Sequence, residues 1–264
     1  MSANGAKISL MANILGVEIS DLNKRAVEQK LRSFLGSDQQ HYVVTPNPEF
    51  VVAAQEDEDF REIINNADLS IADGVGLQYA ARYLGQPALP RITGNDLMQM
   101  LAGVCAETGK SMYLLGGSDR SAEKSASILE DQYPTLKVGS NAGGLIFIED
   151  GEWKMDPKLI REIINFQPST LFVALGHGKQ EKWIISFLHH LPSVRIAAGI
   201  GGAFDYLSGN VPRAPRLVRK LGLEWLYRLI KEPRRIKRIW TAVIIFTYFV
   251  VKYSIVNTYG RKQK

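Results

Sequence analysis

The residues in this sequence best suited to chemistry stand directly after short apolar runs. Asp73 follows the run LSIA and precedes Gly-Val-Gly, so the backbone can turn sharply and leave a carboxylate beside a ligand. In the loop TPNPE, Thr45 to Glu49, two prolines stiffen the chain around Asn47. The structural alternatives are a helix cap at Asp73 and an ordinary rigid turn at TPNPE.

Two glycine-rich segments carry polar groups that a purely structural turn does not need. ALGHGKQEKW, residues 174–183, ends an apolar run in glycines and continues into a polar helix start. GIGGAFDYLSG, residues 199–209, repeats this design, and Asp205 in it can accept hydroxyl groups of a ribose or sugar. The candidate ligand contacts of the two segments are Gly176, Lys179, Gln180, Glu181, Gly201, Gly202 and Asp205.

A third turn, Gly116-Gly117-Ser118, can offer helix amides to a phosphate or a sugar hydroxyl. Because these turns supply orientation and no redox centre, they favour a sugar nucleotide or a similar polyhydroxylated ligand. Other nucleotide signatures fail. ETGKS lacks the first glycine of a P-loop, where Val104 stands, and no G-x-G-x-x-G fingerprint is present.

The sequence shows no pattern for a metal or a cofactor, and we expect neither. The histidines have no metal-ligand spacing with Cys105 or a carboxylate. The acidic run EDED, residues 56–59, lies in a helical pattern and is interpreted as a solvated helix face. The single cysteine excludes a disulfide within the chain and favours a reducing compartment. Residues 1–12 lack an apolar run of signal-peptide length, so secretion by that route is not expected.

Apolar runs of strand length alternate with helical patterns through most of the chain. The expected strands are 41–45, 69–72, 111–117, 136–140, 170–176 and 194–202, with a hairpin or edge strand in 8–20. The expected helices are 49–66, 76–84, 94–109, 118–133, 156–166 and 179–191. This order predicts an α/β fold with a mainly parallel sheet covered by helices on both faces. Ligands bind such sheets at the carboxyl ends of the strands, where the candidate residues stand.

The positive charge of the chain is concentrated at its C-terminal end. From Arg213 onward there are 14 Lys and Arg residues and two acids, which leaves 18 basic and 25 acidic residues in 1–212. Near 210–215 the segment VPRAP interrupts the periodicity. We therefore expect a catalytic domain over 1–210 and a basic helical appendage over 211–264 that meets an anionic partner such as a membrane surface.

The uncharged run 239–251 of this appendage would be about 20 Å long as a helix, too short to cross a bilayer core of about 30 Å. Extended to Tyr259 it would reach about 31 Å. Because basic residues flank it on both sides, an in-plane or shallow re-entrant anchor is preferred over a single span. Pro233 separates Arg228 from Arg235 and Arg238, which share one helix face.

With these segments assembled, the sequence resembles the WecG/TagA/CpsF glycosyltransferases, family 26, over about residues 10–240. The matching blocks are TPNPEF (45–50), ADGVG (72–76), RITGNDL (91–97), YLLGG (113–117), LGHGKQEKW (175–183), GIGGAFDYLSG (199–209) and RAPRLVRKLGLEWLYRLIKEPRR (213–235). The family usually has proline where this chain has Gly178. This difference puts the shape of that turn in question.

The resemblance implies a Rossmann-like fold of the GT-E type and an inverting transfer from a UDP-sugar to an undecaprenyl-diphosphate-linked N-acetylglucosamine. The sugar can be N-acetylmannosamine, its uronic acid, glucose or glucuronate. The implied general base is Asp73, and the implied catalytic or acceptor-binding residues are Thr45, Asn47, Arg91 and Gln180. The implied nucleotide and diphosphate contacts are Asp205, Arg228, Arg235 and Arg238. The resemblance also implies a C-terminal appendage that closes the active site, and a location on the cytoplasmic face of the bacterial plasma membrane, peripheral or monotopic.

Arginines that bind phosphate oxygens, together with the absence of a usable Asp-x-Asp motif, predict catalysis without a metal. The alternative from another class is a non-catalytic α/β module that binds membranes or anions through its tail. It explains the tail and leaves the polar strand ends unexplained. A nucleic-acid partner is not expected, because the body is acidic and the aromatic residues of the tail do not alternate with its cations. A homo-oligomer stays open.

Overall fold

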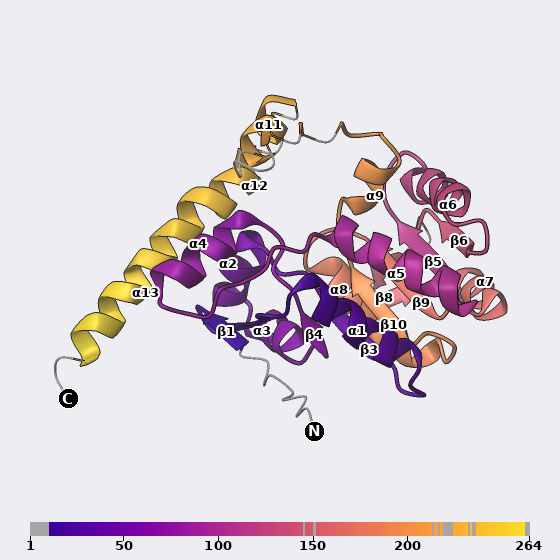
Figure 1. Cartoon of the computed structure of the whole chain (residues 1–264), viewed down its shortest axis with the longest axis horizontal. Coiled ribbons are helices and arrows are strands. Elements are labelled where there is room, and N and C mark those ends of the chain that lie inside the picture. Colours follow the sequence, from indigo (N-terminus) through magenta and orange to yellow (C-terminus); the bar gives the residue numbers. More distant parts are fainter. Residues whose placement is uncertain are drawn as a thin grey trace, which may run out of the picture.

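A computed structural model of the chain describes residues 11–144, 146–149, 152–212, 214–215, 217–218, 224–231, 233 and 236–261. Six parallel strands form the central sheet in the order β4-β3-β10-β9-β5-β6. Their bounds are β3 His41–Val44, β4 Leu69–Ser70, β5 Ser111–Gly116, β6 Lys137–Asn141, β9 Thr170–Ala174 and β10 Ile196–Gly199. Each lies within or overlaps a strand expected from the sequence, and the predicted parallel α/β fold is confirmed (Figure 1).

Helices cover both faces of this sheet because successive strand residues point to opposite sides. Leu171 and Val173 of β9 belong to one apolar core, and Phe172 between them belongs to the other. The first core is closed by α2 Pro48–Glu56, α3 Glu58–Asn65, α4 Val75–Tyr83, α7 Pro157–Phe166 and α8 Lys179–Phe187. The second is closed by α1 Lys24–Leu35, α5 Gly94–Thr108, α6 Ser121–Gln132 and α9 Ala203–Leu207.

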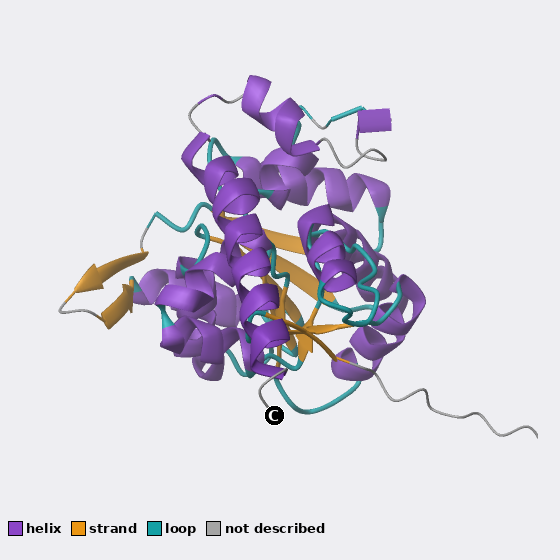
Figure 2. Cartoon of the chain, turned by 90° about the vertical axis from the view of Figure 1, so that its left-hand side faces the viewer, coloured by secondary structure: helices purple, strands orange, loops and turns teal. Residues whose placement is uncertain are grey.

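Two antiparallel hairpins flank the sheet. The expected N-terminal hairpin consists of β1 (Met11–Ile14) and β2 (Val17–Ser20). The second hairpin, β7 (Ile146–Glu149) and β8 (Glu152–Met155), was not predicted from the sequence and projects from the body (Figure 2).

The single helix expected over 49–66 is two helices, and this part of the prediction is wrong. Asp57 ends α2 and caps α3, with its carboxylate accepting the backbone N–H of Phe60 at 2.8 Å. The same carboxylate accepts from Nζ of Lys182 at 2.7 Å, which holds the pKa of Asp57 below its usual range. Capping competes with helix continuation, so Asp57 does not lie on the solvated helix face expected for EDED.

The C-terminal region is helical as expected. After α11 (Glu224–Lys231), the segments α12 (Ile236–Trp240), η3 (Thr241–Ile245) and α13 (Phe246–Arg261) follow one another without a break. Together they form a long helix that runs past α4 and α2 (Figure 1). The stretch Ile236–Val256 is long and apolar enough to cross a membrane, and 11% of its most apolar window is buried. Whether 1–210 and 211–264 are separate domains stays a prediction.

The segment η3 is a π turn, whose backbone hydrogen bonds join residues five apart instead of the four of an α-helix. It packs against α2, and the next turns bury Phe246 and Val250 in the first apolar core. Residues between them, such as Tyr248, are exposed. The long helix is therefore seated on the body by one narrow apolar edge and leaves its other sides uncovered.

Candidate active site

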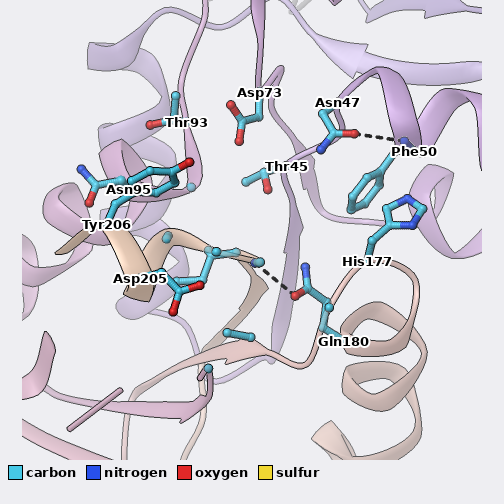
Figure 3. Close-up of a pocket in the computed structure, with 18 of the residues that line it drawn as sticks. Thr45, Asn47, Phe50, Asp73, Thr93, Asn95, His177, Gln180, Asp205 and Tyr206 are labelled. Carbon is cyan, nitrogen blue, oxygen red and sulfur yellow. Dashed lines mark hydrogen bonds between the residues drawn. The ribbon is translucent and has the colours of Figure 1, made fainter. Parts of the chain in front are cut away.

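A cavity of ≈ 330 Å³ lies at the carboxyl ends of the central strands. Loops after β3, β4, β5, β9 and β10 supply its walls, as expected for a parallel α/β sheet. The predicted site residues that line it are Thr45, Asn47, Asp73, Arg91, Gly117, Gly176, Gln180, Gly201, Gly202, Asp205 and Arg238. Residues far apart in the sequence thus meet at one place (Figure 3).

Asp73 lines the cavity. The N-cap position of α4 is held by the next residue, Gly74. The backbone N–H of Asp73 donates to the carbonyl of Pro46 at 2.8 Å, which ties the two loops together. Gly74 has a φ of +109°, a backbone conformation that favours glycine. This turn leaves the Asp73 carboxylate at the cavity (Figure 3).

Asn47 serves both the fold and the cavity. Its side-chain oxygen accepts the backbone N–H of Phe50 at 3.1 Å and caps α2. This oxygen therefore has a structural role, as the alternative interpretation of TPNPE expected. The amide nitrogen of Asn47 is turned toward the cavity (Figure 3). Thr45 is buried, and its hydroxyl donates to the carbonyl of Gly199 at 3.3 Å, which links β3 to the end of β10.

The turn between β9 and α8 places Gln180 at the base of the cavity. Oε1 of Gln180 accepts the backbone N–H of Gly201 at 3.1 Å, so two glycine-rich segments are joined directly. Gly178 has a φ of +75°, which proline cannot adopt. A proline at this position would therefore require a different turn. The Gln-Glu pair of this chain still begins a helix, with Lys179 as first residue.

Ser118 and Asp205 meet on the far side of the cavity, where the Ser118 hydroxyl donates to Oδ1 of Asp205 at 3.0 Å. Gly116 and Gly117 before them have φ values of +96° and +83°. A side chain at Gly116 would place its Cβ 2.5 Å from the carbonyl oxygen of Ala174. These glycines allow the close approach of β5 and β9. The helix α6 begins at Ser121, three residues later than expected.

Some predicted residues do not line this cavity. Gly116 ends β5 beneath it, and Lys179 is not part of its lining. Arg228 lies in α11, and its side chain is outside the described residues, as is Arg235 altogether. Arg238 reaches the cavity, with Nε and Nη2 donating to the carboxylate of Glu49 at 2.8 and 3.3 Å.

Several lining residues were not singled out as site residues from the sequence. They are Phe50, Thr93, Asn95, His177 and Tyr206. The ring of His177 packs edge-on against Phe50 and Phe60 at 4.6 and 5.5 Å between centroids. Burial lowers the pKa of His177, so the imidazole is neutral near pH 7. The position of His177 directly after a strand was a usable signal, because the neighbouring glycines were assigned on the same grounds.

A second, larger cavity of ≈ 750 Å³ adjoins the first along the C-terminal helix. Most of its walls are apolar, and they come from α4 and from the segment 239–251. They include Val75, Ala80, Ile239, Ala242, Val243, Phe246, Val250 and Val251, with Tyr79, Tyr83 and Trp225 at exposed positions. We call this cavity the apolar groove. Four residues line both cavities: Asn47, Asp73, Arg91 and Arg238.

Within the described part of the chain, no group of three or more His, Cys, Asp or Glu side chains could hold a metal ion. The polar cavity instead presents two carboxylates, amides, glycine turns and two arginines. A guanidinium group can bind two phosphate oxygens at once, in a bidentate contact, and carboxylates and amides bind hydroxyl groups. Fold and site therefore define a class of protein: an α/β protein that handles a phosphate-bearing, hydroxyl-rich substrate beside an apolar one.

Comparison with known proteins identifies the family. The chain belongs to the glycosyl transferase WecG/TagA/CpsF family, whose model matches residues 12–259. A relative from Staphylococcus aureus strain MRSA252, "N-acetylglucosaminyldiphosphoundecaprenol N-acetyl-beta-D-mannosaminyltransferase", is 30% identical over 252 residues, which cover 95% of this chain and 94% of the relative. The protein of the same name from strain NCTC 8325 is also 30% identical over 252 residues. The family resemblance drawn from the sequence blocks is confirmed, and the chain is a glycosyltransferase.

Proposed function

We propose that this glycosyltransferase moves a sugar from a UDP-sugar to the 4-hydroxyl of N-acetylglucosamine on undecaprenyl diphosphate, with inversion and without a metal. The observation that carries the proposal is the meeting of a polar and an apolar cavity at Asp73. A lipid-linked sugar likewise has a polar part, the sugar with its diphosphate, and an apolar part, the lipid chain. The printed name of the staphylococcal relatives supports N-acetylmannosamine as the transferred sugar and undecaprenyl diphosphate as the lipid carrier.

In the proposed reaction, Asp73 takes the proton from the acceptor hydroxyl as that oxygen attacks the anomeric carbon. The bond between this carbon and the UDP oxygen breaks on the opposite face, so one displacement inverts the configuration. General-base assistance of this kind contributes roughly 10²–10⁴ in rate. Asp73 lies on the boundary of the two cavities, where a hydroxyl from the apolar side would meet a sugar from the polar side.

The leaving UDP gains negative charge, which preplaced positive groups stabilise. Arg91 and Arg238 line the polar cavity and are the described cations suited to this task. Arg228 and Arg235 are proposed as further diphosphate contacts on the same appendage. The glycine turns at Gly117, Gly176 and Gly201 bring backbone close to the ligand, and Asp205 is proposed to accept a hydroxyl of the nucleotide.

The apolar groove and the long C-terminal helix support a location at the cytoplasmic face of the bacterial plasma membrane. The helix presents the exposed apolar residues Ile236, Trp240, Ile244, Val251 and Ile255. Burial of such residues in lipid contributes about 25 cal/mol per Å² of apolar surface. We propose that the helix docks on the membrane, peripherally or as a monotopic anchor, and brings the groove to the isoprenoid chain of the acceptor.

The test is a transfer assay with the full-length protein in detergent and a synthetic lipid-diphosphate N-acetylglucosamine. A panel of UDP-sugars is offered, UDP release is measured, and proton NMR of the product reports the anomeric configuration. We expect UDP-N-acetylmannosamine to be the best donor, a β-linked product from its α-linked sugar, and full turnover in EDTA. Loss of turnover in EDTA would contradict the metal-free mechanism. Vesicle binding without UDP release would favour the non-catalytic module.

A further inference from the structure

We infer that Glu181 is a positioning residue for nucleotide-sugar binding: it fixes the side-chain amide of Gln180 and, through it, the glycine turn at Gly201. This inference rests on the proposed function and assigns a role to a residue outside the cavity lining. Glu181 is 1% exposed and Gln180 is 2% exposed, so both side chains are held inside the protein.

The hydrogen bonds around these side chains allow one orientation of the amide. Oε1 of Gln180 accepts the N–H of Gly201 at 3.1 Å, and Nε2 donates to Oε1 of Glu181 at 2.6 Å. Oε2 of Glu181 accepts the N–H of Gly178 at 2.9 Å. A reversed amide would place its oxygen against the carboxylate and its nitrogen against an N–H donor, and both contacts are repulsive.

An amide nitrogen carries two protons, so Nε2 of Gln180 has a second one to offer. Figure 3 shows this nitrogen directed toward the cavity, and Gln180 belongs to the cavity lining. The carboxylate of Glu181 therefore ensures that a hydrogen-bond donor, and not an acceptor, faces the ligand. Through Gln180 it also holds the Gly201 turn, which lines the cavity.

The surroundings of this pair are unusual for a simple helix cap. A Cβ on Gly199 would lie 2.5 Å from Oε1 of Glu181 and 2.6 Å from Nε2 of Gln180, so β10 ends in glycine to make room for both. The carbonyl of the same glycine accepts from the Thr45 hydroxyl. Capping needs only the bond from Glu181 to the Gly178 N–H, which a glutamine at this position can also accept.

Glu181 is kept buried without a cation beside it in the part of the chain that the structure describes. The ammonium of Lys182 pairs instead with Asp57, and His177 is neutral near pH 7. Tyr42 on β3 is buried near Glu181 and has a raised pKa, first because of burial. Burial raises the pKa of Glu181 to about 7. Protonation would turn one carboxylate oxygen into a donor, so one of the two hydrogen bonds that Glu181 accepts would be lost as the pH falls through about 7.

The experiment measures binding of UDP-N-acetylmannosamine by calorimetry from pH 6 to pH 8, where the diphosphate of this probe does not titrate. Wild-type affinity is expected to fall severalfold between pH 8 and pH 6. E181Q keeps a cap but faces Gln180 with a second amide nitrogen; its affinity at pH 8 should be about tenfold weaker, in line with one lost hydrogen bond, and independent of pH. E58Q, the same change at an exposed helix position, is the control and should match the wild type.

Thermal unfolding of all three proteins tests whether they fold. If E181Q folds and binds the probe like the wild type at every pH, Glu181 is only a helix cap and the inference is wrong. If E181Q does not fold, the wild-type protein still decides, because a flat pH profile of binding would overturn the inference. Absence of binding by the wild type would contradict the proposed function itself, whereas binding without these effects contradicts this inference alone.

Discussion

The polar cavity and the apolar groove touch each other but are built in different ways. Apart from Arg238, the lining of the polar cavity comes from loops and helix starts beside the ends of neighbouring strands, so these residues come together when the sheet forms. The groove exists only where the C-terminal helix packs against α2 and faces α4, segments about 160 to 190 residues from it in the sequence. Chemistry is thus set by the sheet, and access of an apolar ligand is set by a peripheral helix. Separate damage to the two cavities should give separate kinetic defects.

The largest effect is expected in the polar cavity, from Asp73→Asn. This change keeps the size of the side chain and removes the base, so kcat should fall by at least about a hundredfold. Binding of the UDP-sugar, measured by calorimetry, should stay within about threefold of wild type, because asparagine retains the polar contacts. Near-normal turnover would show that Asp73 is not the general base, and the polar cavity would then have no assigned catalytic base.

Two C-terminal truncations test the contributions of the polar cavity and the apolar groove separately. Removal of everything after Asn210 deletes Arg238 and should abolish transfer even with a soluble acceptor in detergent. Removal of Ile239 onward keeps Arg238 but deletes one wall of the groove. That protein should retain much of its turnover with a short-chain acceptor and lose at least about tenfold in kcat/KM with a long isoprenoid chain. Equal loss with both acceptors would show that the groove is part of the catalytic site.

A matched pair of substitutions tests the groove with the helix intact. Val243 lines the groove, whereas its neighbour Ile244 is exposed and does not. Val243→Asp should raise KM for a long-chain lipid acceptor about tenfold or more, because a carboxylate is costly to desolvate against an isoprenoid. Ile244→Asp should change this KM little in detergent. The KM of the UDP-sugar should be unchanged in both variants. A rise in this KM would show that the groove also contributes to donor binding, against the proposed division between the two cavities.

The smallest effect is expected at the contact between the two regions. The ion pair of Arg238 with Glu49 is half-exposed on the arginine side, and such pairs contribute only about 0–1 kcal/mol. Glu49→Gln should therefore change the KM of the UDP-sugar by less than about threefold. Arg238→Ala should raise it by about tenfold, because a charge-assisted contact with phosphate is lost. If the two changes had the same effect, Arg238 would act by seating the helix and not by binding the donor.

The sequence was informative where local rules decide the structure. The six core strands and most helices followed from apolar runs and periodicity, and the strand ends located most of the polar cavity. Asp57 shows where such rules fail, because a capping carboxylate divided an otherwise continuous helical pattern. The β7–β8 hairpin escaped prediction because its short strands pair only with each other.

The apolar groove could not be predicted from periodicity. Tyr79 and Tyr83 on α4 and Val243 on the C-terminal helix belong to ordinary helical patterns, and only tertiary packing brings them together. The π turn at Thr241–Ile245 has no signature in the sequence, although it sets which residues after it face the body. Glu181 was visible as a polar residue after a strand, but its burial and its bond to Gln180 depend on Gly199, which lies on another strand.

Arg238 lines both cavities from a helix that carries the apolar segment. A side chain shared in this way couples the occupancy of one cavity to that of the other. For a transferase this coupling bears on fidelity, since water competes with the acceptor for the activated sugar. If Arg238 completes the donor site only while the helix is seated against lipid, an enzyme away from its acceptor holds UDP-sugar without cleaving it. The placement of one arginine would then decide between transfer and hydrolysis, and the order in which the two substrates can productively bind.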